Sequence, residues 1–97
     1  MEQIELSYPA KREVSRRAHV GVVGSGDLEV LLEPTEGEVA HVSIRTSVDG
    51  FGETWTAVLD RFFTKYDGAV RIQINDAGAT PGSVQLRLEQ AVEVSER

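Results

Sequence analysis

Apolar and polar residues alternate with a period of two in three stretches of this chain. One residue in two is leucine, valine or isoleucine, and the residues between them are mostly polar. A period of two is typical of strands that bury one face. A fourth run, rich in valine, is also strand-like. We therefore predict strands over 19–23, 28–32, 42–45 and 70–75.

A different periodicity appears between Phe51 and Tyr66, where apolar residues recur three or four positions apart. This spacing places them along one side of a helix. The members of this stripe are Phe51, Trp55, Val58, Leu59, Phe62 and Tyr66. Ser47 or Asp49 can cap the start of the helix, and Gly68 fits just past its end.

A second helix is predicted from Pro81 onward, because Thr80 is a good N-cap and proline suits the first helical position. The apolar residues Val84, Leu88, Ala91 and Val92 form its stripe. Val84, Leu86 and Leu88 also alternate, so a strand is the alternative for this segment. We prefer the helix because the run is long and Pro81 opens it.

The predicted order is β-β-β-α-β-α, with a further candidate short strand around Ile4–Ser7 ahead of a loop after Pro9. We expect an α+β fold in which about four strands form a mixed sheet and both helices pack on one face. The segment 42–74 should form a right-handed crossover between parallel strands, and 19–32 an antiparallel hairpin. The length fits a single domain, 1–97.

Composition excludes several classes of function. The chain has no cysteine, so disulfides and thiolate metal sites are excluded. Sixteen acidic and ten basic residues give a net charge of −6, which argues against nucleic acid as a partner. No apolar run approaches membrane-spanning length, and the N-terminus does not resemble a signal peptide. We expect a cytoplasmic protein with no membrane partner.

The residues that commonly carry catalysis are sparse. His19 and His41 each lie in or beside a predicted strand without a visible partner, so neither is predicted to be catalytic or a metal ligand. Asp76 can act as an acid or base, but its position before Gly78 favours an Asx-turn. The glycines before Leu28 lead into a strand, so they form no phosphate loop. We predict no catalytic residue and no metal site.

Ser25 is the candidate functional residue, in the segment Gly24-Ser25-Gly26-Asp27 between two predicted strands. The flanking glycines permit positive φ and remove side-chain bulk, so we expect the hydroxyl at the exposed tip of a hairpin. The strand–serine–helix context of a hydrolase is absent. A carrier needs an exposed hydroxyl on a rigid base, since the chemistry then belongs to the attached group and to partner enzymes. A plain turn in a binding module is the alternative.

An ordered set of segments resembles the acyl carrier (delta) subunit of biotin-independent malonate decarboxylase. The resemblance covers nearly the whole chain. Its segments are Gly24-Ser25-Gly26-Asp27-Leu28-Glu29-Val30, Arg45-Thr46-Ser47-Val48-Asp49-Gly50-Phe51-Gly52, Asn75-Asp76-Ala77-Gly78-Ala79-Thr80-Pro81-Gly82 and Leu86-Arg87-Leu88-Glu89. The acyl carrier (gamma) chain of citrate lyase is similar at a greater distance and is an alternative. Ordinary acyl carriers are all-helical bundles with serine after aspartate, whereas a glycine precedes Ser25.

The resemblance implies that Ser25, flanked by Gly24 and Gly26, carries 2′-(5″-triphosphoribosyl)-3′-dephospho-coenzyme A through a phosphodiester. In that family an acetyl thioester on the arm exchanges with malonate, and decarboxylation of the malonyl thioester restores the acetyl form. The implied partners are the acyl transferase and decarboxylase subunits of the complex, the transferase that attaches the prosthetic group, and a malonyl transferase. The chain itself would be a non-catalytic carrier.

Charge around Ser25 suggests where such an anionic arm would lie. Asp27, Glu29 and Glu33 follow the serine and should repel the arm within a screening length of about 8 Å. Arg16 and Arg17 precede the first predicted strand and are candidate contacts for its phosphates. A solvated surface is the simpler interpretation of these charges.

Overall fold

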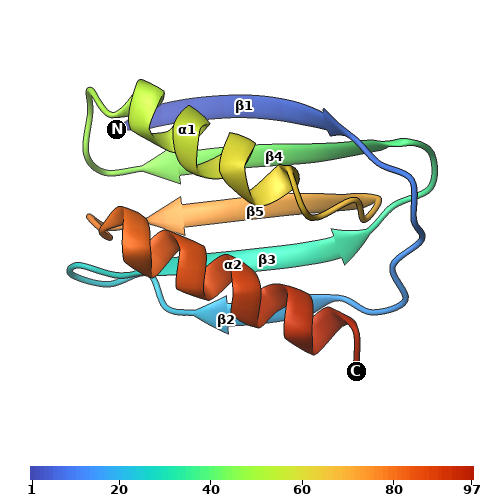
Figure 1. Cartoon of the computed structure of the whole chain (residues 1–97). Helices are drawn as coiled ribbons and strands as arrows, with labels where there is room; N and C mark the ends of the chain where they lie inside the picture. The colour runs from blue at the N-terminus through green and yellow to red at the C-terminus, as the bar shows by residue number, and fades with distance from the viewer.

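The computed structural model describes all 97 residues, which form one five-stranded sheet with two helices on one face (Figure 1). The expected α+β class is therefore confirmed. The elements are β1 (Glu2–Pro9), β2 (Ala18–Gly21), β3 (Leu28–Pro34), β4 (Val39–Thr46), α1 (Gly52–Phe63), β5 (Val70–Asp76) and α2 (Pro81–Ser95). Neither helix is long and apolar enough to cross a membrane.

The sheet is mixed, with the strand order β1-β4-β5-β3-β2. β4 and β5 pair in parallel, and β2 and β3 form an antiparallel hairpin, as predicted. The fifth strand is β1, which pairs antiparallel with β4 along its whole length. It is longer than the short strand expected around Ile4–Ser7, because backbone pairing continues from Glu2 to Pro9.

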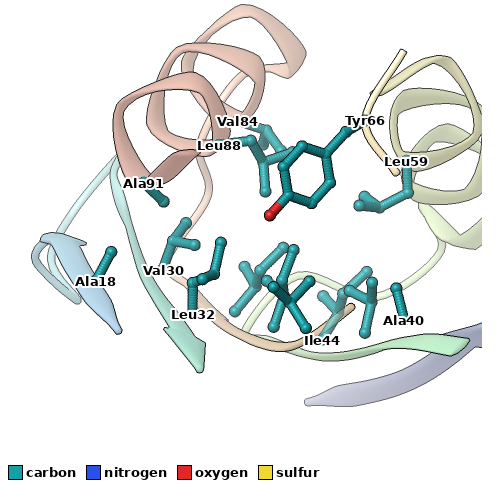
Figure 2. Packing of buried hydrophobic residues seen from close by; sticks show 14 of the residues in the cluster. Ala18, Val30, Leu32, Ala40, Ile44, Leu59, Tyr66, Val84, Leu88 and Ala91 are labelled. Carbon is teal, nitrogen blue, oxygen red and sulfur yellow. The ribbon is translucent and has the colours of Figure 1, made fainter. Parts of the chain in front are cut away.

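The core lies between the sheet and the two helices. Figure 2 shows Leu59 of α1 and Leu88 of α2 pointing toward Val30, Leu32 and Ile44 of the sheet. All five side chains are almost completely buried. Burying a leucine or isoleucine side chain stabilises a fold by about 1.5–3 kcal/mol, so the alternating pattern of the strands reflects the main favourable contribution to folding.

The predicted cap of α1 is wrong. Phe51 occupies the N-cap position and no side chain caps the helix. Asp49 instead forms an ion pair with the N-terminal amine at 3.2 Å, and the Ser47 backbone N–H donates to the Asp76 carbonyl at 3.1 Å. Both predicted caps lie ahead of the N-cap position, so neither side chain reaches the first turn of the helix.

The predicted end of α1 is also wrong. The helix ends at Phe63, and Gly68 lies in a bridge with Arg12 rather than in a helix cap. A β-carbon at Gly68 would stand 2.3 Å from the Tyr66 Oη, so close packing against the tyrosine explains this glycine. α2 does begin as predicted, since the Ser83 N–H donates to the Thr80 Oγ1 at 3.2 Å.

Strand register brings the segments of interest to one edge of the sheet. Leu28 at the start of β3 and Thr46 at the end of β4 both pair with Asp76 at the end of β5. The loops 22–27, 47–51 and 77–80 therefore meet at the same edge, which we call the serine edge. Both helices follow parallel strands, so their N-termini also lie at the serine edge (Figure 1).

Candidate functional site

Ser25 occupies a hydrogen-bonded turn in the loop between β2 and β3. The Asp27 N–H donates to the Gly24 carbonyl at 2.9 Å, and Gly26 has φ +75°. Positive φ at the third residue matches a type II turn, for which glycine is the least strained residue. Ser25 is exposed at the second position. The prediction that Ser25 lies exposed in the turn between these two strands is thus confirmed.

The first predicted strand ends earlier than expected, at Gly21 rather than at Val23. Gly21 has φ +78°, which takes the chain out of the extended conformation. Val22 and Val23 are consequently exposed in the loop instead of pairing with β3. The loop that presents Ser25 is therefore six residues long, 22–27, and needs anchors beyond its own turn.

Backbone hydrogen bonds attach this turn to the loop between β5 and α2. The Gly26 N–H donates to the Ala77 carbonyl at 2.8 Å, and the Ala77 N–H donates to the Asp27 carbonyl at 2.9 Å. These bonds continue the pairing of β3 with β5 by one residue beyond Leu28 and Asp76. The turn is thus an extension of the sheet.

An ion pair adds a second anchor. The Arg87 guanidinium donates to both carboxylate oxygens of Asp27, from Nη2 at 2.7 Å and from Nε at 3.3 Å. The Leu28 N–H also donates to this carboxylate, at 2.7 Å. Arg87, followed by the Leu28 N–H, lowers the pKa of Asp27 below its ordinary value. Asp27 therefore remains a carboxylate that fixes the loop to α2.

Nothing in the chain covers the serine. A β-carbon placed on Gly24 or on Gly26 would meet no atom within 4 Å. The space on both sides of the Ser25 side chain is accordingly open. An exposed hydroxyl in open space, on a turn held by three kinds of contact, is accessible to a modifying enzyme.

The other residues considered from sequence lie elsewhere. Arg16 and Arg17 are exposed ahead of β2, at the end opposite the serine edge. Four strand residues separate them from the loop, or about 13 Å along the strand. Asp76 closes the predicted Asx-turn, since its Oδ2 accepts from the Gly78 N–H at 3.1 Å. No cluster of three or more metal-ligating side chains occurs.

Both histidines have neighbours that sequence did not reveal. His19 Nε2 lies 2.9 Å from Glu29 Oε2, and His41 Nδ1 lies 3.3 Å from Ser7 Oγ. Both pairs stand on strand positions that alternate with the buried ones, so they occupy the sheet face that carries no helix. They are thus separate from the core and belong to the uncovered face of the sheet.

Arg87 is the site residue whose role in holding the Ser25 loop was not predicted from the sequence. A signal was available, because Arg87 falls three residues after Val84 and four before Ala91, within the buried stripe of α2. A charged residue at such a position requires a partner. Its partner Asp27 is 60 residues away in sequence, so only the fold identifies it.

Replacing Arg87 with methionine should lower the free energy of unfolding at pH 7, because Asp27 loses its partner. The lowered pKa of Asp27 fixes the pH dependence: the contribution is present above the ordinary value of 3.8 and is lost as pH falls through the lower folded value. Denaturation of both proteins at pH 7 and pH 2 measures this. The difference should shrink at pH 2, and Arg71→Met on the helix-free face is the control. An equal difference at both pH values would contradict the ion-pair interpretation.

Comparison with known proteins supports the resemblance found in the sequence. A family model described as malonate decarboxylase delta subunit (MdcD) matches residues 15–95. The malonate decarboxylase acyl carrier protein of Azotobacter vinelandii is 47% identical over 94 residues, covering 96% of this chain and 95% of the relative. That of Burkholderia cepacia is 50% identical, covering 94% and 87%.

A solved structure is similar over almost the entire fold. One chain of a Pseudomonas malonate decarboxylase hetero-tetramer in complex with malonate has a TM-score of 0.93 and 45% sequence identity. The match covers 97% of this chain and 98% of that one. The family model, the relatives and the similar structure each match most of this chain. This chain therefore belongs to the malonate decarboxylase acyl carrier (delta subunit) family.

Proposed function

We propose that this chain is the acyl carrier of a malonate decarboxylase complex and that Ser25 is its attachment residue. The observation that carries the proposal is the exposed Ser25 hydroxyl on an anchored and uncovered turn. The family membership supports the same role, because the relatives are acyl carrier proteins. Gly24 and Gly26 serve the site by leaving room around the hydroxyl.

The proposed modification joins Ser25 to 2′-(5″-triphosphoribosyl)-3′-dephospho-coenzyme A. The Ser25 oxygen attacks the innermost phosphorus of the triphosphate, forming a new P–O bond. The bond to the outer two phosphates breaks, and they leave as pyrophosphate. The hydroxyl proton passes to a base, and the product is a phosphodiester. Ser25 stands clear enough of the fold to enter the active site of an attaching enzyme.

The base for this step has to come from the attaching enzyme. Asp27 is the nearest carboxylate along the chain, but both of its oxygens accept from Arg87 or from the Leu28 N–H. These contacts lower the pKa of Asp27, which makes the carboxylate a weaker base. The chain therefore presents the nucleophile and leaves its activation to the partner.

The attached group would supply a terminal thiol that holds acetyl and malonyl groups as thioesters. A thioester carbonyl stabilises the carbanion left by departing CO₂, which the carboxylate of free malonate does poorly. The chain contributes a tether and a rigid base. Acyl transfer and decarboxylation would belong to partner subunits, in agreement with the hetero-tetramer named for the similar structure.

The mass of the intact protein tests the proposal. Chain purified from a host that contains the attaching enzymes should be heavier than its sequence mass by the full nucleotide-containing arm. A gain equal to phosphopantetheine alone would contradict the assigned prosthetic group. The unmodified mass in such a host would favour the alternative, a protein-interaction module in which Gly24-Ser25-Gly26 is only a turn.

We also propose that Arg16 and Arg17 contact the phosphates of the arm, whose length allows it to reach past β2. Replacing both with glutamate should slow acyl transfer between subunits about threefold to tenfold at low salt, with a smaller effect at high salt. Stopped-flow or quenched measurements of transfer would detect this. Arg71→Glu is the control for added negative charge, compared with Arg16→Glu and Arg17→Glu as single variants that change the charge equally. Unchanged kinetics in the double variant would refute the assignment.

A further inference from the structure

A pocket of about 400 Å³ opens at the serine edge, between the N-terminal halves of α1 and α2. Its volume lies within the range of small-molecule sites. Most of its wall is apolar. The apolar side chains are Val48, Phe51, Trp55, Val58, Ala79 and Val84. No lysine or arginine lines it.

The rim of this pocket is unusually exposed for apolar residues. Phe51 is 51% exposed and Val48 is 38% exposed, and both line the opening. Exposed large hydrophobic residues also gather nearby, at Val22 and Val23 in the loop of Ser25. Apolar surface left open at one edge of a small domain usually marks a binding site.

The one charged group that lines the pocket is the carboxylate of Asp76, and its hydrogen bonds are all to neighbouring residues. Asp76 accepts from the Thr46 hydroxyl at 2.8 Å, from the Gly78 N–H at 3.1 Å and from the Ala79 N–H at 2.9 Å. A buried carboxylate without a neighbouring cation repels a second anion. The pocket therefore suits an uncharged ligand with an apolar end.

The pocket and the Ser25 turn share one loop. Gly26 bonds to Ala77, and the residues on either side of Ala77, Asp76 and Gly78, line the pocket. Backbone geometry places the Ser25 Cα within about 10 Å of this rim. Pantetheine is the outer end of the proposed arm, and the phosphoribosyl and nucleotide parts lie between it and Ser25. The arm is therefore longer than this distance and has to fold back to place its thioester in the pocket.

We propose that this pocket holds the acetyl thioester end of the group tethered to Ser25 and excludes the malonyl form. The inference rests on the proposed function for its tethered ligand. The acetyl end is small and uncharged, whereas the malonyl end would bring a carboxylate into an apolar pocket beside Asp76. The pocket would shelter the acetyl thioester between turnovers and release the arm once it carries malonyl.

Modest affinity is sufficient for this role. A fragment of about ten non-hydrogen atoms binds a pocket of this kind with a Kd in the millimolar range. A flexible tether gives an effective concentration of at most about millimolar, which falls as the tether becomes longer. A substantial fraction of the arm then stays free of the pocket, so partner subunits can still engage it.

The test uses free probes on the unmodified chain, so that it does not depend on the attachment at Ser25. S-acetyl-N-acetylcysteamine is titrated against labelled protein and followed by amide NMR shifts. Fluorescence of Trp55 is a second readout, because it is the one tryptophan, is 6% exposed and lines the pocket. The acetyl probe should shift the amides of Val48, Trp55 and Ala79 at millimolar concentration. The malonyl thioester of the same carrier should bind at least tenfold more weakly.

Two variants locate the binding. Ala79→Phe fills the pocket and should reduce acetyl-probe affinity at least fivefold. Phe51→Ala removes part of the rim and should weaken binding similarly. Leu86→Ala is the matched control, because Leu86 is 54% exposed on α2 and lies outside the pocket. Equal loss in the Leu86 variant would overturn the assignment.

Other outcomes separate this inference from the proposed function. Chain loaded with the acetylated arm should show the same amide shifts without added probe. No shift with either probe, equal shifts with both, or shifts only on addition of partner subunits would overturn the pocket assignment while leaving the carrier role intact. An unmodified mass from the native host, together with selective binding of the acetyl probe, would contradict the carrier role and leave the pocket assignment intact.

Discussion

Replacing Ser25 with alanine is expected to abolish malonate decarboxylation by a complex reconstituted with this chain. Alanine has no oxygen through which a phosphodiester can form, so no arm and no thioester can be held. Activity should fall to the background of the assay. Stability should change by less than about 0.5 kcal/mol, since Ser25 is exposed.

Ser47→Ala is the matched control for this experiment. Ser47 is also exposed and also lies at the serine edge, but its contact with Asp76 uses the backbone. Decarboxylation by the control should match that of the unchanged chain. Full activity in the Ser25 variant, with its fold intact by circular dichroism, would remove Ser25 from the attachment role.

Replacing Gly21 with alanine should destabilise the fold by more than about 3 kcal/mol. Left-handed backbone costs a non-glycine residue about 1–2 kcal/mol, and Gly21 has φ +78°. Its new β-carbon would also stand 2.1 Å from the Leu28 carbonyl oxygen and 3.2 Å from the Arg87 Nε. Leu28 is fully buried and paired with Asp76, so the backbone cannot easily move aside.

Gly26→Ala separates the cost of left-handed backbone from the cost of the steric clash at the new β-carbon. Gly26 has a nearly identical φ of +75°, but a β-carbon there meets no atom within 4 Å. Its cost should be only the conformational one, about 1–2 kcal/mol. Urea denaturation of both variants gives the comparison. Equal costs at the two glycines would mean that the close approach of β2 to β3 and α2 is unimportant.

Local patterns in the sequence were sufficient for the main elements. Alternation over 28–32 and 70–75 identified β3 and β5, because each strand buries one face against the helices. The stripe from Phe51 to Tyr66 identified α1, although the stripe continues past Phe63, where the helix ends. The glycines around Ser25 placed this residue in the connecting loop, since few other residues adopt such a turn.

Features that depend on residues far apart in sequence were predicted less accurately. β1 was underestimated because its inward side chains are only half-buried and because its length is set by pairing with β4, which is far away in sequence. The cap at Asp49 failed because the helix begins at Gly52, which puts Asp49 two residues ahead of the N-cap position, where its carboxylate pairs with the N-terminal amine. The Asp27–Arg87 pair and the pocket between the two helices arise only when α2 packs against the sheet.

The location of the modification tests the central claim most directly. Trypsin cuts after Arg17 and next after Arg45, so a single peptide, 18–45, carries Ser25, Thr35 and Ser43. Fragmentation of this peptide, from chain made in a host with the attaching enzymes, assigns any added mass to one hydroxyl. The account predicts the whole mass on Ser25. Added mass on Thr35 or Ser43, or an unmodified peptide throughout, would contradict it.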